Sequence, residues 1–141
     1  MKKIFFRYAD KKVLLKDKLH IREFVETVLE QENRKLTTIN YIFCSDDYLL
    51  QINKSFLQHD FYTDIITFDL SENKNFIIGE IYISVDRVKE NALEQKTAFQ
   101  NEMLRVIFHG ALHLCGYKDK SPAEKKKMNL AEDKYLKLYL G

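Results

Sequence analysis

The feature that most constrains this chain is a long apolar segment that contains two histidines. From residue 101 to residue 115, apolar side chains fall on nearly every side of a 3.6-residue helix, so we expect a buried, central helix. His109 and His113 lie one turn apart on the same face of this helix. Because an unpaired polar group in a protein interior costs on the order of 1–3 kcal/mol, the two imidazoles need a common partner.

A divalent metal ion is such a partner, because histidines at positions i and i+4 can direct ring nitrogens to one point about 2 Å from each. Gly116 fits the left-handed position that ends a helix, and the returning chain brings Asp119 within reach as a third ligand. Three protein ligands leave a fourth position for water, which the metal acidifies, or for an oxygen that it polarises. We therefore predict one Zn²⁺ per chain, with His109, His113 and Asp119 as both metal ligands and catalytic residues.

Two other interpretations of these histidines were weighed. A histidine on an apolar helix is usually a core residue that is hydrogen-bonded to a backbone carbonyl, but the helix-ending glycine and the aspartate three residues later favour a metal site. In zinc peptidases a glutamate follows the first histidine and serves as the general base. That position is Gly110 here, so the chain lacks the base of the usual peptidase reaction.

The run from His109 to Tyr117, HGALHLCGY, with an acidic residue two positions later, resembles the H-G-x-L-H-L-x-G-Y-D-H signature of the YbeY-type endoribonucleases. The resemblance extends upstream. Residues 52–68, with Asn53, Phe56, Asp60 and Thr63-Asp64, are similar to the family's L-N-x-x-Y-R-x-x-D-x-P-T-D-V-L-S-F block, and residues 79–83 are similar to its G-D-I strand. These motifs occur in the family's order and cover about two thirds of the chain.

The resemblance implies a metal-dependent, single-strand-specific endoribonuclease that acts in ribosomal RNA maturation, at the 3′ end of 16S rRNA, and in ribosome quality control. Its partners would be single-stranded RNA, rRNA and the small ribosomal subunit. Two departures stand out. Asp119 replaces the family's third histidine, and Leu57 replaces an arginine expected to touch phosphate, which leaves His59 and Lys54 as nearby cations. The general base is not identified, and the RNA 2′-hydroxyl could itself be the nucleophile.

Two rival functions remain open at the level of sequence. One is a metallopeptidase, against which Gly110 argues. The other is a zinc-stabilised ribosome-assembly factor that binds RNA without cutting it, since a three-ligand site permits catalysis without proving it.

Charge and hydropathy bear on location and substrate. No segment approaches the roughly 20 apolar residues of a membrane span, and Arg7 cuts the first apolar run below the roughly 7–15 residues of a signal-peptide core, so we expect a cytoplasmic protein with no membrane partner. The net charge of +2 does not indicate nucleic-acid binding, but basic residues gather in residues 1–22 and 118–127. Such clusters are commonly solvated surface; the family resemblance favours a phosphate-binding patch.

The expected fold is a single α+β domain over residues 1–141, a mixed β-sheet covered by helices with the metal helix at its centre. Cys44 and Cys115 show no paired spacing and are expected to be reduced core residues, rather than a disulfide or metal ligands. The expected strands are residues 3–8, 38–44, 64–68 and 76–84, the last two forming a hairpin across the turn-prone residues 71–75. The expected helices are residues 18–32, 46–56, one from 85, 101–115, and one that begins with the capping box Ser121-Pro122-Ala-Glu124.

Four further polar positions have two interpretations each. Asp60 and Thr63-Asp64 precede a strand and either form turn hydrogen bonds or line the cleft beside the metal. Glu80 lies in an apolar strand and either faces outward by alternation or supports a metal-bound imidazole.

Overall fold

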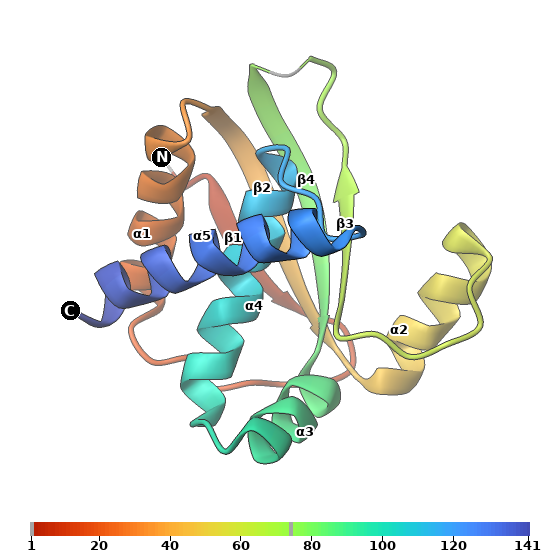
Figure 1. Ribbon diagram of the computed structural model, residues 1–141. Coiled ribbons are helices and arrows are strands. Elements are labelled where there is room, and N and C mark those ends of the chain that lie inside the picture. The colour runs from red at the N-terminus through yellow and green to blue at the C-terminus, as the bar shows by residue number, and fades with distance from the viewer. Residues whose placement is uncertain (1, 74) are drawn as a thin grey trace.

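Four strands form one mixed sheet in the order β1-β2-β4-β3 in the computed structural model, which describes residues 2–73 and 75–141 (Figure 1). The strands are β1 (Ile4–Tyr8), β2 (Lys35–Cys44), β3 (Ile65–Asp69) and β4 (Phe76–Ser84). β1, β2 and β4 run parallel, and β3 pairs with β4 in the antiparallel direction as the predicted hairpin. Residue 74 of the predicted turn lies outside the described residues.

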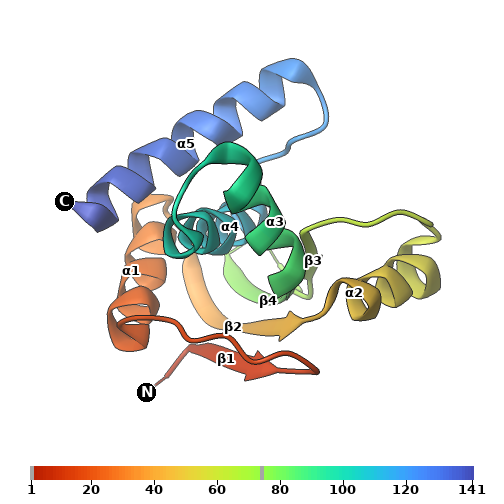
Figure 2. The same cartoon turned by 90° about the horizontal axis from the view of Figure 1, so that it is seen from below.

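Helices cover one face of this sheet, and a last helix lies over them. The helices are α1 (Lys18–Gln31), α2 (Asp46–Ile52), α3 (Val85–Gln95), α4 (Phe99–Leu114) and α5 (Pro122–Leu140). Figure 2 shows α1, α4 and α3 on one face of the sheet and α5 on the side of α4 away from the sheet. α2 continues into a π-helical turn, η1 (Asn53–Leu57), and projects from the body beside β3. The predicted α+β class is confirmed.

α4 is the central helix that the apolar pattern predicts. Met103, Ile107, Phe108, Ala111 and Leu112 are fully buried. A buried tyrosine also ties the helix to the sheet, because the Tyr41 hydroxyl on β2 donates to the Ile107 carbonyl at 2.8 Å. These contacts hold α4 between the sheet and α5.

Two glycines allow α4 to approach the sheet closely. A Cβ atom at Gly110 of α4 would lie 2.8 Å from the Ile81 Cδ1, and one at Gly79 of β4 would lie 2.5 Å from the Leu114 Cδ1. Both distances are shorter than normal contacts between carbon atoms. The helix therefore packs where a side chain at either position would separate it from β4.

Most local predictions agree with the structure. The capping box at Ser121 is present, with reciprocal bonds between Ser121 and Glu124. β2 begins three residues earlier than predicted, at Lys35, and its pairing with β4 is irregular between Leu36 and Thr38. The helix after Ser45 is α-helical only to Ile52, because the following turn is a π-helix.

Both cysteines are buried and free, as predicted. Burial raises the pKa of the Cys44 and Cys115 thiols to about 12, so neither is a thiolate near neutral pH. Within residues 2–73 and 75–141, no helix is both long and apolar enough to span a bilayer.

Gly79→Ala is expected to destabilise the protein, because the added methyl group displaces Leu114 in a packed core. We expect a loss of about 1–3 kcal/mol in the free energy of unfolding, measured by urea denaturation. Leu114→Ala removes the clashing side chain, so the double variant should cost less than the sum of the two single variants. A Gly79→Ala protein as stable as the parent would contradict this packing.

Candidate active site

The end of α4 turns the chain back toward the two histidines. Gly116 has a φ of 107°, the left-handed conformation that the sequence predicts. The amide of Gly116 donates to the His113 carbonyl at 3.0 Å, and that of Tyr117 donates to the Leu112 carbonyl at 3.1 Å. This bond pair is the Schellman motif. It reverses the chain and places Asp119 beside the helix.

His109 is held between two carboxylates. Its Nδ1 lies 2.5 Å from the Glu132 Oε2, and its Nε2 lies 3.3 Å from the Asp119 Oδ2. Glu132 is only 4% exposed and also accepts a bond from the Arg105 guanidinium at 3.0 Å. Glu132 therefore fixes the orientation of the imidazole and leaves Nε2 facing Asp119, the arrangement in which carboxylates support metal-bound histidines.

The charge of these neighbours decides the protonation of His109. Burial lowers the pKa of His109, but the hydrogen bond and charge of Glu132 raise it more, with smaller contributions from Asp119 and Asp64. The pKa of His109 is raised as a result, so the imidazolium is stabilised beside these carboxylates.

His109, His113 and Asp119 all line one small pocket of about 210 Å³. Of the three, only His109 and Asp119 are in direct contact, and His113 is exposed one helical turn away. In the described part of the chain, no group of three His, Cys, Asp or Glu side chains is already arranged to hold a metal ion. The chemistry of the donor set fits zinc, since two imidazoles and a carboxylate share the pocket and Glu132 orients the first imidazole. The full ligand set stays a prediction.

A larger cleft of about 760 Å³ lies on the other side of His109, between α4, α5 and the chain before β3. Its lining is rich in carboxylates, contributed by Asp64, Glu102, Asp119, Glu132 and Asp133. Arg105 in this cleft already pairs with Glu132 and Asp133. Burial raises the pKa of Asp64 and of Glu102, although His109 opposes the shift at Asp64 and Arg105 opposes it at Glu102.

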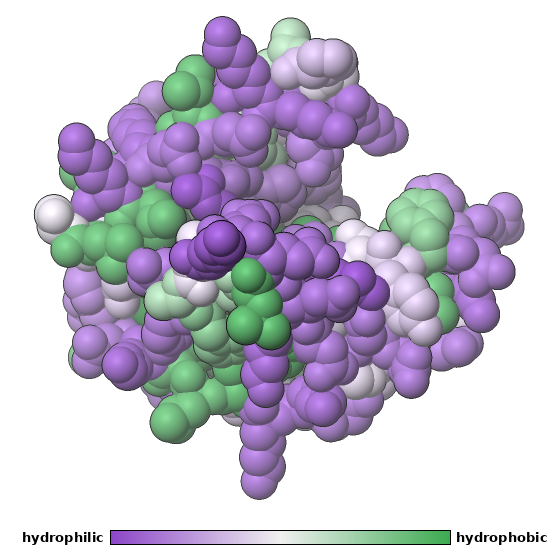
Figure 3. Space-filling view, turned by 60° about the horizontal axis from the view of Figure 1, so that its bottom comes forward, coloured by the Kyte–Doolittle hydropathy of each residue, from purple (hydrophilic) through white to green (hydrophobic). Residues whose placement is uncertain are grey.

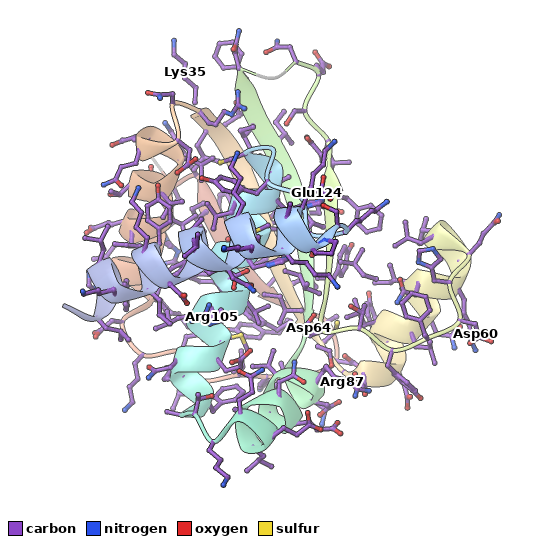
Figure 4. All side chains as sticks on the ribbon, in the orientation of Figure 1. Lys35, Asp60, Asp64, Arg87, Arg105 and Glu124 are labelled. Carbon is purple, nitrogen blue, oxygen red and sulfur yellow. The ribbon has the colours of Figure 1, made fainter. Side chains whose placement is uncertain are left out.

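The residues before β3 separate into two groups. Thr63 and Asp64 line the cleft, as one of the two interpretations expected. Asp60 does not line it: its carboxylate is 81% exposed and pairs with Lys54 at 3.4 Å. Figure 4 shows Asp64 beside the sheet and Asp60 far out on the projecting segment. Of the two residues proposed as candidates to replace the arginine at Leu57, His59 lines the small pocket, whereas Lys54 pairs with Asp60.

Glu80 faces away from the site. The residues that alternate with it on β4 are buried, and its carboxylate accepts a bond from the Tyr82 hydroxyl at 3.4 Å. The outward-facing interpretation is therefore right, and the residue that supports the imidazole is Glu132. Sequence reasoning did not single out Glu132, a charged residue within the last helix. The signal was present, since Glu132 lies among the buried residues Met128, Ala131 and Tyr135 of α5.

These features define a class of α+β domain in which the end of a buried helix and the turn after it present histidines and an aspartate to a cleft. The solution structure of a Thermotoga maritima protein has the same fold, with a TM-score of 0.66, 30% identity, and coverage of 95% of this chain and 88% of that one.

The model of the family described as Endoribonuclease YbeY matches residues 6–140, and the chain belongs to this family. A Cytophaga hutchinsonii protein named Endoribonuclease YbeY is 50% identical over 135 residues, which are 96% of this chain and 94% of that protein. A Flavobacterium psychrophilum protein of the same name is 51% identical over 116 residues, 82% of each chain. The resemblance seen in the motifs is thereby confirmed.

Glu132→Gln should lower the pKa of His109 in protein kept metal-free with a chelator, because it removes the negative charge beside Nδ1. The stabilising effect of the pair is fully present below about pH 6.5, the ordinary histidine pKa, and is lost as pH rises through the raised value. The variant should therefore show a flatter dependence of stability on pH in this range. NMR titration of the His109 ring and urea denaturation across pH 5–9 would measure both effects.

Glu124→Gln is the matched control, since Glu124 lies on the same helix and contacts Ser121 rather than His109. An unchanged His109 pKa in Glu132→Gln would contradict the assigned contact.

Proposed function

We propose that this protein is a zinc-dependent, single-strand-specific endoribonuclease of the cytoplasm that acts in maturation of the 3′ end of 16S rRNA and in ribosome quality control. The observation that carries the proposal is the convergence of His109, His113 and Asp119 on one pocket, in a chain whose relatives are named Endoribonuclease YbeY. Its partners would be single-stranded RNA, rRNA and the small ribosomal subunit.

The residues that would hold the zinc ion are His109 through Nε2, His113 and Asp119. A zinc ion bound there would stabilise negative charge on the scissile phosphate or make a water molecule more acidic. Glu132 would keep the His109 ring in its orientation during the reaction, because it is hydrogen-bonded to Nδ1 of that ring. The contact with Arg105 in turn holds the Glu132 carboxylate in place. Asp119 brings a negative charge to the position of the family's third histidine.

Asp64 and Glu102 are the groups in the cleft best suited to hold a proton. Burial raises the pKa of both carboxyls above the ordinary value, which favours the proton-bound form that a general acid needs. The Asp64 carboxylate also accepts a hydrogen bond from the Asn91 side-chain amide at 3.4 Å. We assign Asp64 as the first candidate for the proton transfer that the sequence leaves without a residue.

The peptidase alternative is disfavoured by the position of Gly110. This residue faces the sheet, where even a Cβ atom would lie 2.8 Å from the Ile81 Cδ1. A glutamate at this position would have to displace the Ile81 and Ile65 side chains, and the glycine that is present supplies no base for the usual peptidase reaction. The RNA-binding factor without catalysis is distinguished from the nuclease by experiment.

His113→Ala and Asp119→Ala should each lose stoichiometric zinc, because removal of one of three ligands weakens the site. Both should melt at a lower temperature than the zinc-loaded parent, since a ligand at 100 times its Kd adds about 2.7 kcal/mol of stability. RNA cleavage should fall at least about 100-fold, by comparison with losses at outer-shell partners. Metal analysis by mass spectrometry, thermal melts and a cleavage assay would measure the three effects.

His20→Ala is the control, because His20 stacks on Tyr139 and does not line the pocket. Full zinc content in His113→Ala or Asp119→Ala would remove that residue from the ligand set.

The zinc-loaded protein should cut unstructured RNA much faster than DNA of the same sequence, if the 2′-hydroxyl takes part in the reaction. Gel analysis of end-labelled RNA, matched DNA and a peptide mixture would compare the three substrates. Binding of RNA without cleavage would support the assembly factor instead. Peptide cleavage with intact RNA would support the peptidase.

A further inference from the structure

The projecting segment that contains α2, η1 and the loop that follows, residues 46–64, is here called the arm (Figure 1). Four aromatic side chains of the arm are exposed to solvent. Phe56 is 71% exposed and Phe61 56% exposed, and Tyr48 and Tyr62 are also exposed. Large exposed apolar surfaces on a small domain mark places where something binds.

The arm has a defined conformation at these rings. Asn53 is 2% exposed, and its side-chain amide donates to the Phe61 carbonyl at 2.9 Å. The Asn53 carbonyl in turn accepts from the His59 amide at 3.0 Å. The His59 and Phe61 rings stack with centroids 5.0 Å apart and planes inclined by 20°. The buried asparagine therefore sets the position of a preformed pair of rings.

This ring pair is continuous with the candidate active site. His59 and Phe61 line the same pocket as His109, His113 and Asp119, with Leu57 at its edge. Figure 3 shows the arm set apart from the body by a notch, with apolar surface on the arm. A ligand in contact with the candidate metal ligands would therefore also meet the two rings.

Electrostatics favour this side of His109 for a polyanion. The larger cleft is lined by five carboxylates against two cations, Lys125 and Arg105, and Arg105 is already paired with Glu132 and Asp133. Among the described residues that line the arm-side pocket, Asp119 supplies the one carboxylate. A phosphate backbone is repelled less along the arm than along the larger cleft.

We propose that the His59–Phe61 ring pair is a stacking platform for an unpaired base of the RNA strand, next to the phosphate that is cut. The inference rests on the proposed function and identifies how that site holds its substrate. Aromatic rings bind single strands because an unpaired base exposes its π-face, whereas a paired base is enclosed in its helix. Stacking would also compensate for Leu57, where the family signature has an arginine, since it supplies affinity without a phosphate contact.

The test measures by fluorescence anisotropy how tightly the 141-residue chain binds a short, unstructured, labelled RNA. Gels would verify that the RNA stays intact. Phe61→Ala should weaken binding about tenfold, the effect of losing one base–aromatic contact. Phe61→Tyr should bind like the parent, because tyrosine keeps the ring. The slope of log affinity against log salt should be the same in all variants, because no phosphate contact is removed.

Phe56→Ala is the matched control, since Phe56 is an exposed aromatic residue of the same arm that does not line the pocket. It should leave RNA affinity unchanged, and equal weakening by both variants would overturn the platform. In cleavage assays, Phe61→Ala should raise KM and leave kcat close to that of the parent.

An RNA of the same length that lacks its bases tests the contact directly. The parent should bind this abasic strand about as weakly as Phe61→Ala does, and the difference between the two proteins should vanish. If Phe61→Ala binds and cuts intact RNA as well as the parent, the platform is overturned and the nuclease function stands. If the parent fails to cut RNA, the proposed function is overturned, while the comparison of intact and abasic strands still tests the platform.

Discussion

The contact between His109 and Glu132 depends on the burial of α4 between the sheet and α5. A carboxylate that is 4% exposed and a largely buried imidazole stabilise one another only when both helices are docked. Docking in turn depends on Gly79 and Gly110, which let α4 approach β4 closely. α4 supplies both buried core residues and the histidines of the site. The contacts that pack this helix therefore also position the site.

Much of this arrangement could be predicted from the sequence, because its signals are local. The apolar pattern of residues 101–115 predicts a buried central helix, and Gly116 predicts the reversal that brings Asp119 back to His109. Capping residues and alternation also predict the element order, since such signals act within a few residues. The start of β2 and the end of α2 differ from the prediction, because strand pairing and a π-helical turn depend on distant contacts.

The parts that could not be predicted involve residues brought together by the fold. Glu132 follows His109 by 23 positions and was not singled out in the sequence, because periodicity alone does not separate a buried carboxylate with a partner from an exposed one. Asp64 and Asp60 gave equal signals in the sequence, yet one lines the cleft and the other pairs with Lys54 at the surface. The path of the loop decides which of the two side chains enters the cleft. That path cannot be read from the few residues between Asp60 and Asp64.

The candidate ligands and the residue that orients them all lie within the α4–α5 helical hairpin, from His109 to Glu132, and the parallel strands contribute none of them. Proteins open in cooperative units, and the free energy of opening differs from one unit to another. Transient detachment of α5 would therefore release the His109 ring while the sheet stays folded. Activity at this site would therefore require that the hairpin stay closed, in addition to a folded sheet.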